Sequence, residues 1–238
     1  MTETDTLKHF REVVTSRRSV KRFTDERIPE EVLQDCFDLA LLAPNSSNLQ
    51  PWSFIRIVDP AVREQANRLC LGQNAAKTAS ELIAIVAHTD TWADNAEAVL
   101  QHWPVQPVPE IVKKYYQKLV PLNFRTGPMN AMAPLKKGLV ALRRQRQSTP
   151  DMHYSEGTIK LWAVKSTALA AENLMLALRA HDFDSCPMEG FDEAGMKKQL
   201  HLGKHEHIVM MIGAGRRAEN GIYHPQFRLP REQFIKEI

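Results

Sequence analysis

Residues 155–181 read SEGTIKLWAVKSTALAAENLMLALRAH and form the strongest helix candidate in the chain. Large apolar side chains recur there with helical spacing among five alanines, at Trp162, Leu169, Leu174, Met175 and Leu178. This spacing predicts one long helix. Because both of its faces are apolar, we expect the helix to be buried on most sides.

Shorter apolar patterns predict the rest of the core. Helical spacing indicates helices over residues 5–16, from Pro29 to Ala43, and from Pro60 onward. Short apolar runs indicate strands over residues 52–58, 82–87 and 207–212. A chain of 238 residues with 43% hydrophobic residues can bury a full core, so we expect a single α+β domain over residues 1–238.

The stretch 92–150 departs from this pattern. It is rich in proline and carries two helical patches, at 110–119 and 135–146. Nothing in its composition marks a flexible linker, so we predict a variable insertion within the one domain. The final stretch, 213–238, has too little apolar content for a core of its own, and we expect this tail to pack on a partner subunit.

Composition excludes several classes of protein. No apolar run approaches the roughly 18 residues of a membrane-spanning helix, and the polar, acidic N-terminus lacks the features of a secretory signal. The three cysteines, Cys36, Cys70 and Cys186, form no C-x-x-C pair, which favours a reducing cytoplasm. The glycine patterns of Rossmann and P-loop nucleotide sites do not occur.

Two polar segments in the N-terminal half could carry chemistry. Arg17, Arg18, Ser19 and Lys21 place three cations and a hydroxyl directly after the first predicted helix. Forked guanidinium donors match phosphate oxygens, although cations also favour a solvated helix end. The loop 43–52, APNSSNLQPW, gathers short polar side chains that bind polar ligands or simply close turns.

A third polar segment, DSCPMEGFD at 184–192, lies near the C-terminus. Its Cys-Pro and Met-Glu-Gly sequence would expose backbone N–H groups that a heteroaromatic ring could use. The alternative is a plain connection between two helices, with Asp192 as the N-cap of the second.

Taken together, these segments resemble the FMN-dependent nitroreductase family. The resemblance covers residues 7–90 and 155–232 and rests on five motifs in order: R-R-S-x-K-x-F from Arg17, P-x-S-S-N-x-Q-P-W from Pro44, W-x-x-K from Trp162, P-M-E-G-F-D from Pro187, and P-x-x-R-L-P from Pro225. It implies a mixed sheet flanked by helices, in a homodimer whose C-terminal tails are exchanged and whose FMN sites lie at the subunit interface.

The resemblance also implies roles for individual residues. Arg17 and Ser19, with Arg18 beside them, would hold the phosphate and ribityl chain, and Lys21 would lie near N1 and O2 of the isoalloxazine. A cation there stabilises the negative charge of the reduced flavin. On this basis no protein group is a catalytic acid or base; the chemistry takes place on the cofactor.

Further cofactor contacts follow from the same resemblance. The backbone N–H of Glu189 would donate to flavin N5 and Gly190 would approach O4, while Pro187 and Met188 cover one face of the ring. The remaining contacts would be Asn74 and Lys77 at the pyrimidine end, Arg228 at the phosphate, and a loop from the other subunit that carries Ser46, Ser47, Asn48 and Gln50. Many relatives have a cation where this chain has Gln226, so Arg216 or Arg217 could substitute for it.

The activity implied is a ping-pong reaction, in which NADH or NADPH reduces FMN and a nitroaromatic, quinone or flavin acceptor then takes two electrons. Alternatives are a specialised family member that uses or modifies flavin, and a flavin-binding or nucleic-acid-binding protein without turnover. A metal site at His201, His205 and His207 lacks accompanying carboxylates, so a polar surface is favoured there.

The net charge of +3 is unevenly distributed. Nine Lys or Arg and no acidic residue lie between 111 and 150, which leaves 22 basic against 28 acidic side chains elsewhere. Three interpretations remain open: a solvated helix surface, a lid over the flavin that attracts dinucleotide phosphates, and a nucleic-acid patch. Few aromatic residues are interleaved with these cations, which disfavours nucleic acid.

Overall fold

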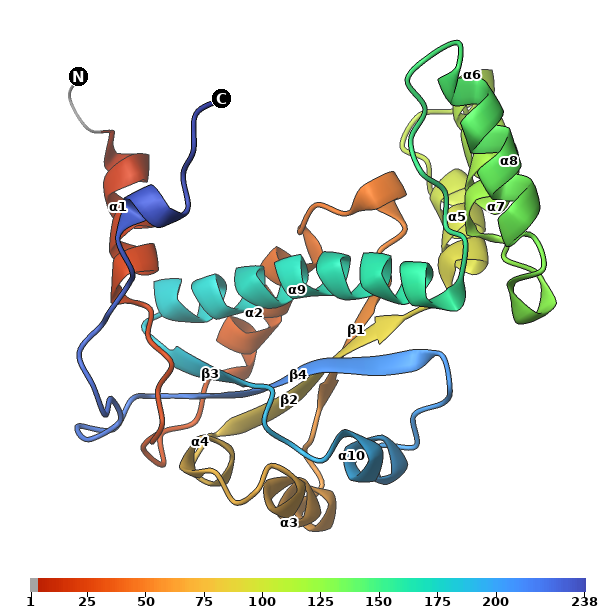
Figure 1. Ribbon diagram of the computed structural model, residues 1–238. Helices are drawn as coiled ribbons and strands as arrows, with labels where there is room; N and C mark the ends of the chain where they lie inside the picture. The colour runs from red at the N-terminus through yellow and green to blue at the C-terminus, as the bar shows by residue number, and fades with distance from the viewer. Residues whose placement is uncertain (1–3) are drawn as a thin grey trace.

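The computed structural model describes residues 4–238 and contains a four-stranded sheet with helices on both faces (Figure 1). The strands are β1 (Trp52–Arg56), β2 (Glu81–His88), β3 (Asp184–Met188) and β4 (Glu206–Gly215). They lie in the order β1-β2-β4-β3, and each neighbouring pair is antiparallel. Among the described residues, parallel pairing is confined to the isolated bridge between Ser19 and Ser185. The predicted α+β class is confirmed, but the four strands form an antiparallel sheet rather than the mixed sheet expected, because each neighbouring pair runs in opposite directions.

The helices flanking the sheet are α2 (Glu30–Leu41), α3 (Pro60–Leu69), α4 (Asn74–Lys77), α9 (Glu156–Ala180) and α10 (Glu193–Gln199), and α1 (Asp5–Ser16) lies beside the end of α9, away from the strands (Figure 1). Their bounds confirm the helices predicted at 5–16, after Pro29, from Pro60 and over 155–181. Asp192 caps α10, as the alternative interpretation of 184–192 expected, because its carboxylate accepts a hydrogen bond from the N–H of Gly195 at 3.0 Å.

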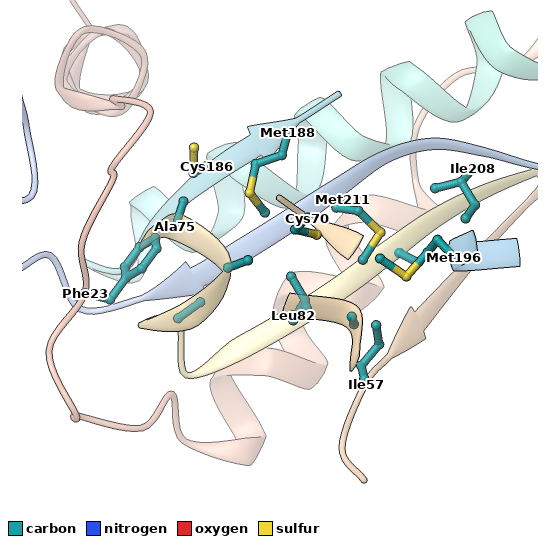
Figure 2. Packing of buried hydrophobic residues seen from close by; sticks show 14 of the residues in the cluster. Phe23, Ile57, Cys70, Ala75, Leu82, Cys186, Met188, Met196, Ile208 and Met211 are labelled. Atoms are coloured by element: carbon teal, nitrogen blue, oxygen red, sulfur yellow. The ribbon is translucent and has the colours of Figure 1, made fainter. Parts of the chain in front are cut away.

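Strand β2 shows how the sheet separates two cores. Leu82, Ala84 and Val86 face the cluster beneath α3 and α10, where Figure 2 shows Met188, Met196 and Met211 packed together. Ile83 and Ile85 face the opposite cluster beneath α2 and α9. This alternation is the two-residue period of a strand buried on both sides.

Helix α9 lies across one face of the sheet (Figure 1). It begins in a capping box, in which Ser155 accepts from the N–H of Thr158 and the Thr158 hydroxyl accepts from the N–H of Ser155. Leu174 and Leu178 are fully buried, whereas Leu161 and Leu169 are exposed on the outer side. The helix is therefore covered on its sheet side and open along part of its outer face.

Strand β3 was not predicted, and the connection between two helices considered for 184–192 is wrong. Pro187 has no N–H, which argues against a central strand, but β3 is an edge strand and tolerates it. The strand is secured at its first residue. Asp184, 2% exposed, accepts from Arg179 at 3.2 Å and from Arg217 at 3.1 and 3.2 Å.

The stretch 92–150 is more helical than predicted. It contains α5 (Trp92–Gln101), α6 (Glu110–Lys114), a π-helical turn (Tyr115–Leu119), α7 (Val120–Phe124) and α8 (Ala133–Arg144). Short 3₁₀ turns complete the described chain at Ser46–Asn48, Pro128–Asn130 and Arg231–Gln233. Figure 1 shows α5–α8 gathered at the N-terminal end of α9, with α1 and the C-terminal tail at the other end. No helix within residues 4–238 is long and apolar enough to cross a membrane.

We predict that Asp184→Asn lowers the free energy of unfolding by about 3 kcal/mol, because it leaves two partly buried guanidinium groups without their carboxylate. Urea unfolding followed by circular dichroism measures the change. Asp182→Asn is the matched control, since Asp182 also binds Arg179 but its side chain is 76% exposed, and it should cost less than about 1 kcal/mol. Equal losses in the two variants would contradict the role assigned to Asp184.

Candidate functional site

A cationic cleft of about 340 Å³ lies between the segment after α1 and the C-terminal segment. Five of the residues predicted to bind the cofactor line it together: Arg17, Arg18, Ser19, Lys21 and Arg228. The other lining residues are 222–227, which include His224 and Gln226, and none of the lining residues is acidic. An acid-free group of four cations and a hydroxyl around a cavity of this size suits a phosphorylated anion.

Hydrogen bonds to backbone carbonyls hold the segment after α1 against β3 and the C-terminal segment. The N–H of Lys21 donates to the carbonyl of Gly221 at 2.7 Å, and the N–H of Val20 donates to the carbonyl of Ser185 at 3.1 Å. The Arg18 guanidinium donates to the carbonyl of His224 at 2.6 Å. The position of the cationic segment therefore depends on both β3 and the C-terminal segment.

The Lys21 ammonium has an unusual neighbour. Its Nζ lies 3.2 Å from Sγ of Cys186, and within residues 4–238 it forms no salt bridge to a carboxylate. A thiol is only a weak acceptor, so the charge of Lys21 remains available to an anion. Cys186 itself is fully buried, as expected of a small thiol beside this loop.

The turn after β3 is fixed from α4. Gln73, at the N-terminal end of α4, donates from Nε2 to the carbonyl of Gly190 at 2.7 Å. Met188 is only 3% exposed and packs in the core shown in Figure 2, so its side chain is not available to cover a ring. Pro187, which is half-buried, remains the candidate for that role.

Asn74, the first residue of α4, is close to the C-terminal segment. Its Nδ2 donates to the phenol oxygen of Tyr223 at 3.0 Å, and Tyr223 lines the same cleft as Lys21. Asn74 therefore joins the predicted group. Sequence reasoning missed Tyr223 and His224; the only sequence signal for them was their place directly before the motif that begins at Pro225.

The loop 46–50 lies in another part of the molecule. Ser47, Asn48 and Gln50 have φ values of 63°, 48° and 44°, and Asn45 holds the loop by accepting from the N–H of Gln50 at 2.9 Å. Asn48 and Gln50 line a second, larger cavity of about 740 Å³. Non-glycine residues rarely adopt such φ values, and strained positions of this kind cluster at binding sites.

The length of α9 gives the approximate separation between this loop and the cationic cleft. Leu49 belongs to the same buried cluster as Ile159, Trp162 and Ala163, which lie near the start of α9. Arg179, near the end of α9, binds Asp184 next to the bridge that joins Ser19 to Ser185. The interval from Ala163 to Arg179 spans roughly 24 Å at 1.5 Å per residue. One protomer therefore does not bring Ser46, Ser47, Asn48 and Gln50 to the cleft.

Arg216 and Arg217 do not replace the cation missing at Gln226. Arg216 donates to both carboxylate oxygens of Glu26 at 3.0–3.2 Å, and Arg217 donates to Asp184. Both guanidinium groups are therefore occupied by acidic partners, and neither lines the cleft.

Comparisons with known proteins identify the family of the chain. The family model described as "Nitroreductase family" matches residues 14–216. The chain belongs to the nitroreductase family. A relative named "NADH dehydrogenase" from Thermus thermophilus is 25% identical, over 92% of this chain and 91% of its own. Protein DrgA of Synechocystis is 30% identical over 88% and 84%. A candidate nitroreductase of Exiguobacterium sibiricum, solved in complex with FMN, has the same fold, with a TM-score of 0.71 and 21% identity over 100% and 99% of the two chains.

In this nitroreductase-family chain, a buried lysine anchors the stretch 92–150. Lys136 is 1% exposed and donates to the carbonyls of Asn123 and His153 at 2.6 and 2.7 Å. Burial lowers the pKa of Lys136. Of the nine cations between 111 and 150, Lys136 is thus internal, and Arg144 is paired with Asp151 at 3.0 Å.

The three C-terminal histidines do not form a metal centre. Helix α10 ends at Gln199, so His201 and His205 do not share a helical face. Nδ1 of His205 instead lies 3.3 Å from the hydroxyl of Thr89. Across residues 4–238, no cluster of three or more His, Cys, Asp or Glu residues could hold a metal ion.

His153 should make stability depend on pH. Its ring packs 4.5 Å from Phe124, and burial, together with the charge of Lys136, lowers its pKa to about 4. The folded state then binds fewer protons than the unfolded state between pH 4 and pH 6.5, so stability falls as the pH drops through this range. We expect a loss of about 1 kcal/mol, after allowance for solvent screening of a half-buried group.

Urea unfolding between pH 7 and pH 4.5 measures this loss. His153→Phe preserves the ring packing and should flatten the pH dependence, whereas replacing the exposed His102 with Gln should leave it parallel to that of the wild type. A His153→Phe profile that also runs parallel to the wild type would contradict the assignment.

Proposed function

We propose that the chain is an FMN-dependent NAD(P)H oxidoreductase that passes two electrons to nitroaromatic, quinone or flavin acceptors. The observation that carries this proposal is the acid-free cleft that gathers Arg17, Arg18, Ser19, Lys21 and Arg228. Family membership supports it, as do the FMN complex of a protein with the same fold and the name NAD(P)H nitroreductase carried by several relatives.

The residues present fit FMN. Arg17, Arg18 and Arg228 would neutralise the phosphate, and Ser19 would donate to it or to the ribityl chain. Lys21, whose charge is unpaired among the described residues, would stabilise negative charge at the pyrimidine edge of the ring. FMN supplies the hydride-accepting and hydride-donating chemistry when bound, and the protein contributes binding, orientation and electrostatics.

We propose a ping-pong order for the reaction, which this division of roles supports. No general acid or base is assigned to the chain, and the dinucleotide and the acceptor would use the same exposed face of the cofactor in turn. The backbone N–H groups of the turn at Glu189 and Gly190, held by Gln73, would direct a fixed dipole toward the ring.

We further propose that two protomers complete each site. The roughly 24 Å along α9 between the cleft and the loop with Ser46, Ser47 and Asn48 supports a loop donated by the other subunit. The C-terminal tail supports exchange between subunits, because it exposes Phe227, Leu229, Phe234, Ile235 and Ile238. Strand β1 offers an unpaired edge, and a cavity of about 310 Å³ lies beside it, between β1 and α2.

The stretch 92–150 is proposed as an insertion that forms a lid. Tyr115 connects this stretch to the loop 46–50, since its phenol oxygen lies 2.7 Å from the hydroxyl of Ser47. The exposed cations Arg143 and Arg146 would draw dinucleotide phosphates toward the site. A cytoplasmic location is proposed as well, which the three free, buried cysteines support.

The first test is FMN binding. We expect wild-type protein incubated with FMN to retain a visible flavin spectrum after gel filtration. Lys21→Ala and Arg17→Ala should each weaken FMN binding about tenfold, because each removes a charge-assisted contact. Lys198→Ala, which removes an exposed cation of α10, is the matched control and should bind like the wild type.

A wild-type protein that gains no flavin spectrum would overturn the proposed function. If FMN binds, oxidation of NADH or NADPH with a nitroaromatic or quinone acceptor separates an oxidoreductase from a flavin-binding protein without turnover. Salt-sensitive retention on DNA would instead favour the nucleic-acid alternative.

A further inference from the structure

Tyr223 lies where three segments of the chain meet. The C-terminal segment is hydrogen-bonded to the cationic segment on either side of this residue, through the carbonyl of Gly221 to Lys21 and the carbonyl of His224 to Arg18. The side chain of Tyr223 then reaches α4, where Asn74 donates to its oxygen at 3.0 Å. The phenol thus joins the C-terminal segment to α4, two parts of the chain whose contacting residues are 149 positions apart in sequence.

The direction of this hydrogen bond leaves the O–H of Tyr223 and the amide oxygen of Asn74 free to bind a ligand. Since the Asn74 amide donates, the phenol oxygen acts as the acceptor and its own O–H remains available as a donor. The amide oxygen of Asn74 is likewise left to accept from another group. Tyr223 and Lys21 line the same cleft, so the unused donors belong to one cavity.

The electrostatic surroundings of Tyr223 also differ from those of an ordinary surface tyrosine. Hydrogen bonding from Asn74 is the largest effect that lowers the pKa of Tyr223; a hydrogen bond from Arg22 and the charges of Arg22 and Lys21 add to it. The side chain is 51% exposed, so the group is accessible to solvent and to a ligand. These features make the phenol a stronger hydrogen-bond donor than tyrosine in water.

We propose that Tyr223 is a further cofactor-site residue, which positions the amide of Asn74 and offers its O–H to the electron-rich pyrimidine edge of the bound flavin beside Lys21. The inference rests on the proposed function. It assigns to the C-terminal segment a part in recognising the ring as well as the phosphate.

Two variants isolate this role. Tyr223→Phe removes only the hydroxyl. Tyr154→Phe is the matched control, because the Tyr154 hydroxyl is also hydrogen-bonded to a side chain, Asp151 at 2.9 Å, but lies outside the cleft. Burial and Asp151 raise the pKa of Tyr154, so the two phenols should titrate apart.

The first measurement uses protein without FMN. Ultraviolet difference absorbance should detect one tyrosine that ionises below the ordinary value of about 10. This early step should disappear in Tyr223→Phe, persist in Tyr154→Phe, and move toward the ordinary value in Asn74→Ala. An early step that persists in Tyr223→Phe would overturn the electrostatic part of the inference.

The second measurement uses FMN itself. Flavin fluorescence quenching should give a dissociation constant roughly fivefold larger for Tyr223→Phe than for the wild type, the effect of one net hydrogen bond. The midpoint potential of the bound flavin should become more negative, and Tyr154→Phe should change neither quantity. In Tyr223→Phe/Asn74→Ala, the two losses should be less than additive, since the residues act as a pair.

The outcomes separate the two proposals. If wild type and Tyr223→Phe bind FMN with the same affinity and potential, the inference about Tyr223 is overturned while the proposed function stands. If the wild type binds no FMN, both are overturned.

Discussion

The length of α9 is the constraint on which the rest of the structure depends. One face of this helix covers the sheet, and a different polar segment of the chain lies beside each of its two ends. The loop with Ser47 and Asn48 packs near its start, and the cationic cleft lies near its end, roughly 24 Å away. A helix packed on the sheet cannot shorten to bring the two together, so a site that uses both would draw them from different protomers.

The positive charge of the cleft also depends on the acidic side chains lying outside it. Glu26 and Asp184 neutralise Arg216 and Arg217 on the structural side of the C-terminal segment. No acid lines the neighbouring cavity, which keeps Lys21 and the other cations available for an anion. The arginines therefore differ in surroundings: Arg217 secures β3 through Asp184, whereas Arg17, Arg18 and Arg228 line a cavity that has no acidic residue in its lining.

Much of the fold could be predicted from hydrophobic periodicity. Helix α9 was predicted within one residue at each end, because its apolar residues recur with helical spacing along its whole length. Strand β3 was missed because Pro187 is acceptable only at a sheet edge, and edge position is a tertiary property. The burial of Lys136 could not be predicted either, since the carbonyls that satisfy it belong to Asn123 and His153, on other segments.

The candidate site was predictable to a different extent. The motif from Arg17 identified the cationic segment, and the structure groups it with Arg228 and, through Tyr223, with Asn74. The sequence could not indicate that the Met188 side chain points into the core, because the register of a strand decides which of its side chains are buried. It also gave no means to predict the contact between Asn74 and Tyr223, which arises from side chains 149 residues apart.

The most direct test of a site shared between protomers is the flavin content of mixed dimers. One chain would carry Lys21→Ala with Arg17→Ala, the other Ser46→Ala with Ser47→Ala and Asn48→Ala, each with its own affinity tag. We predict that neither homodimer retains FMN, whereas the doubly tagged heterodimer retains about one per dimer, because symmetry places both damaged halves in one site and both intact halves in the other. A heterodimer without FMN, or a loop variant that retains FMN on its own, would contradict the account.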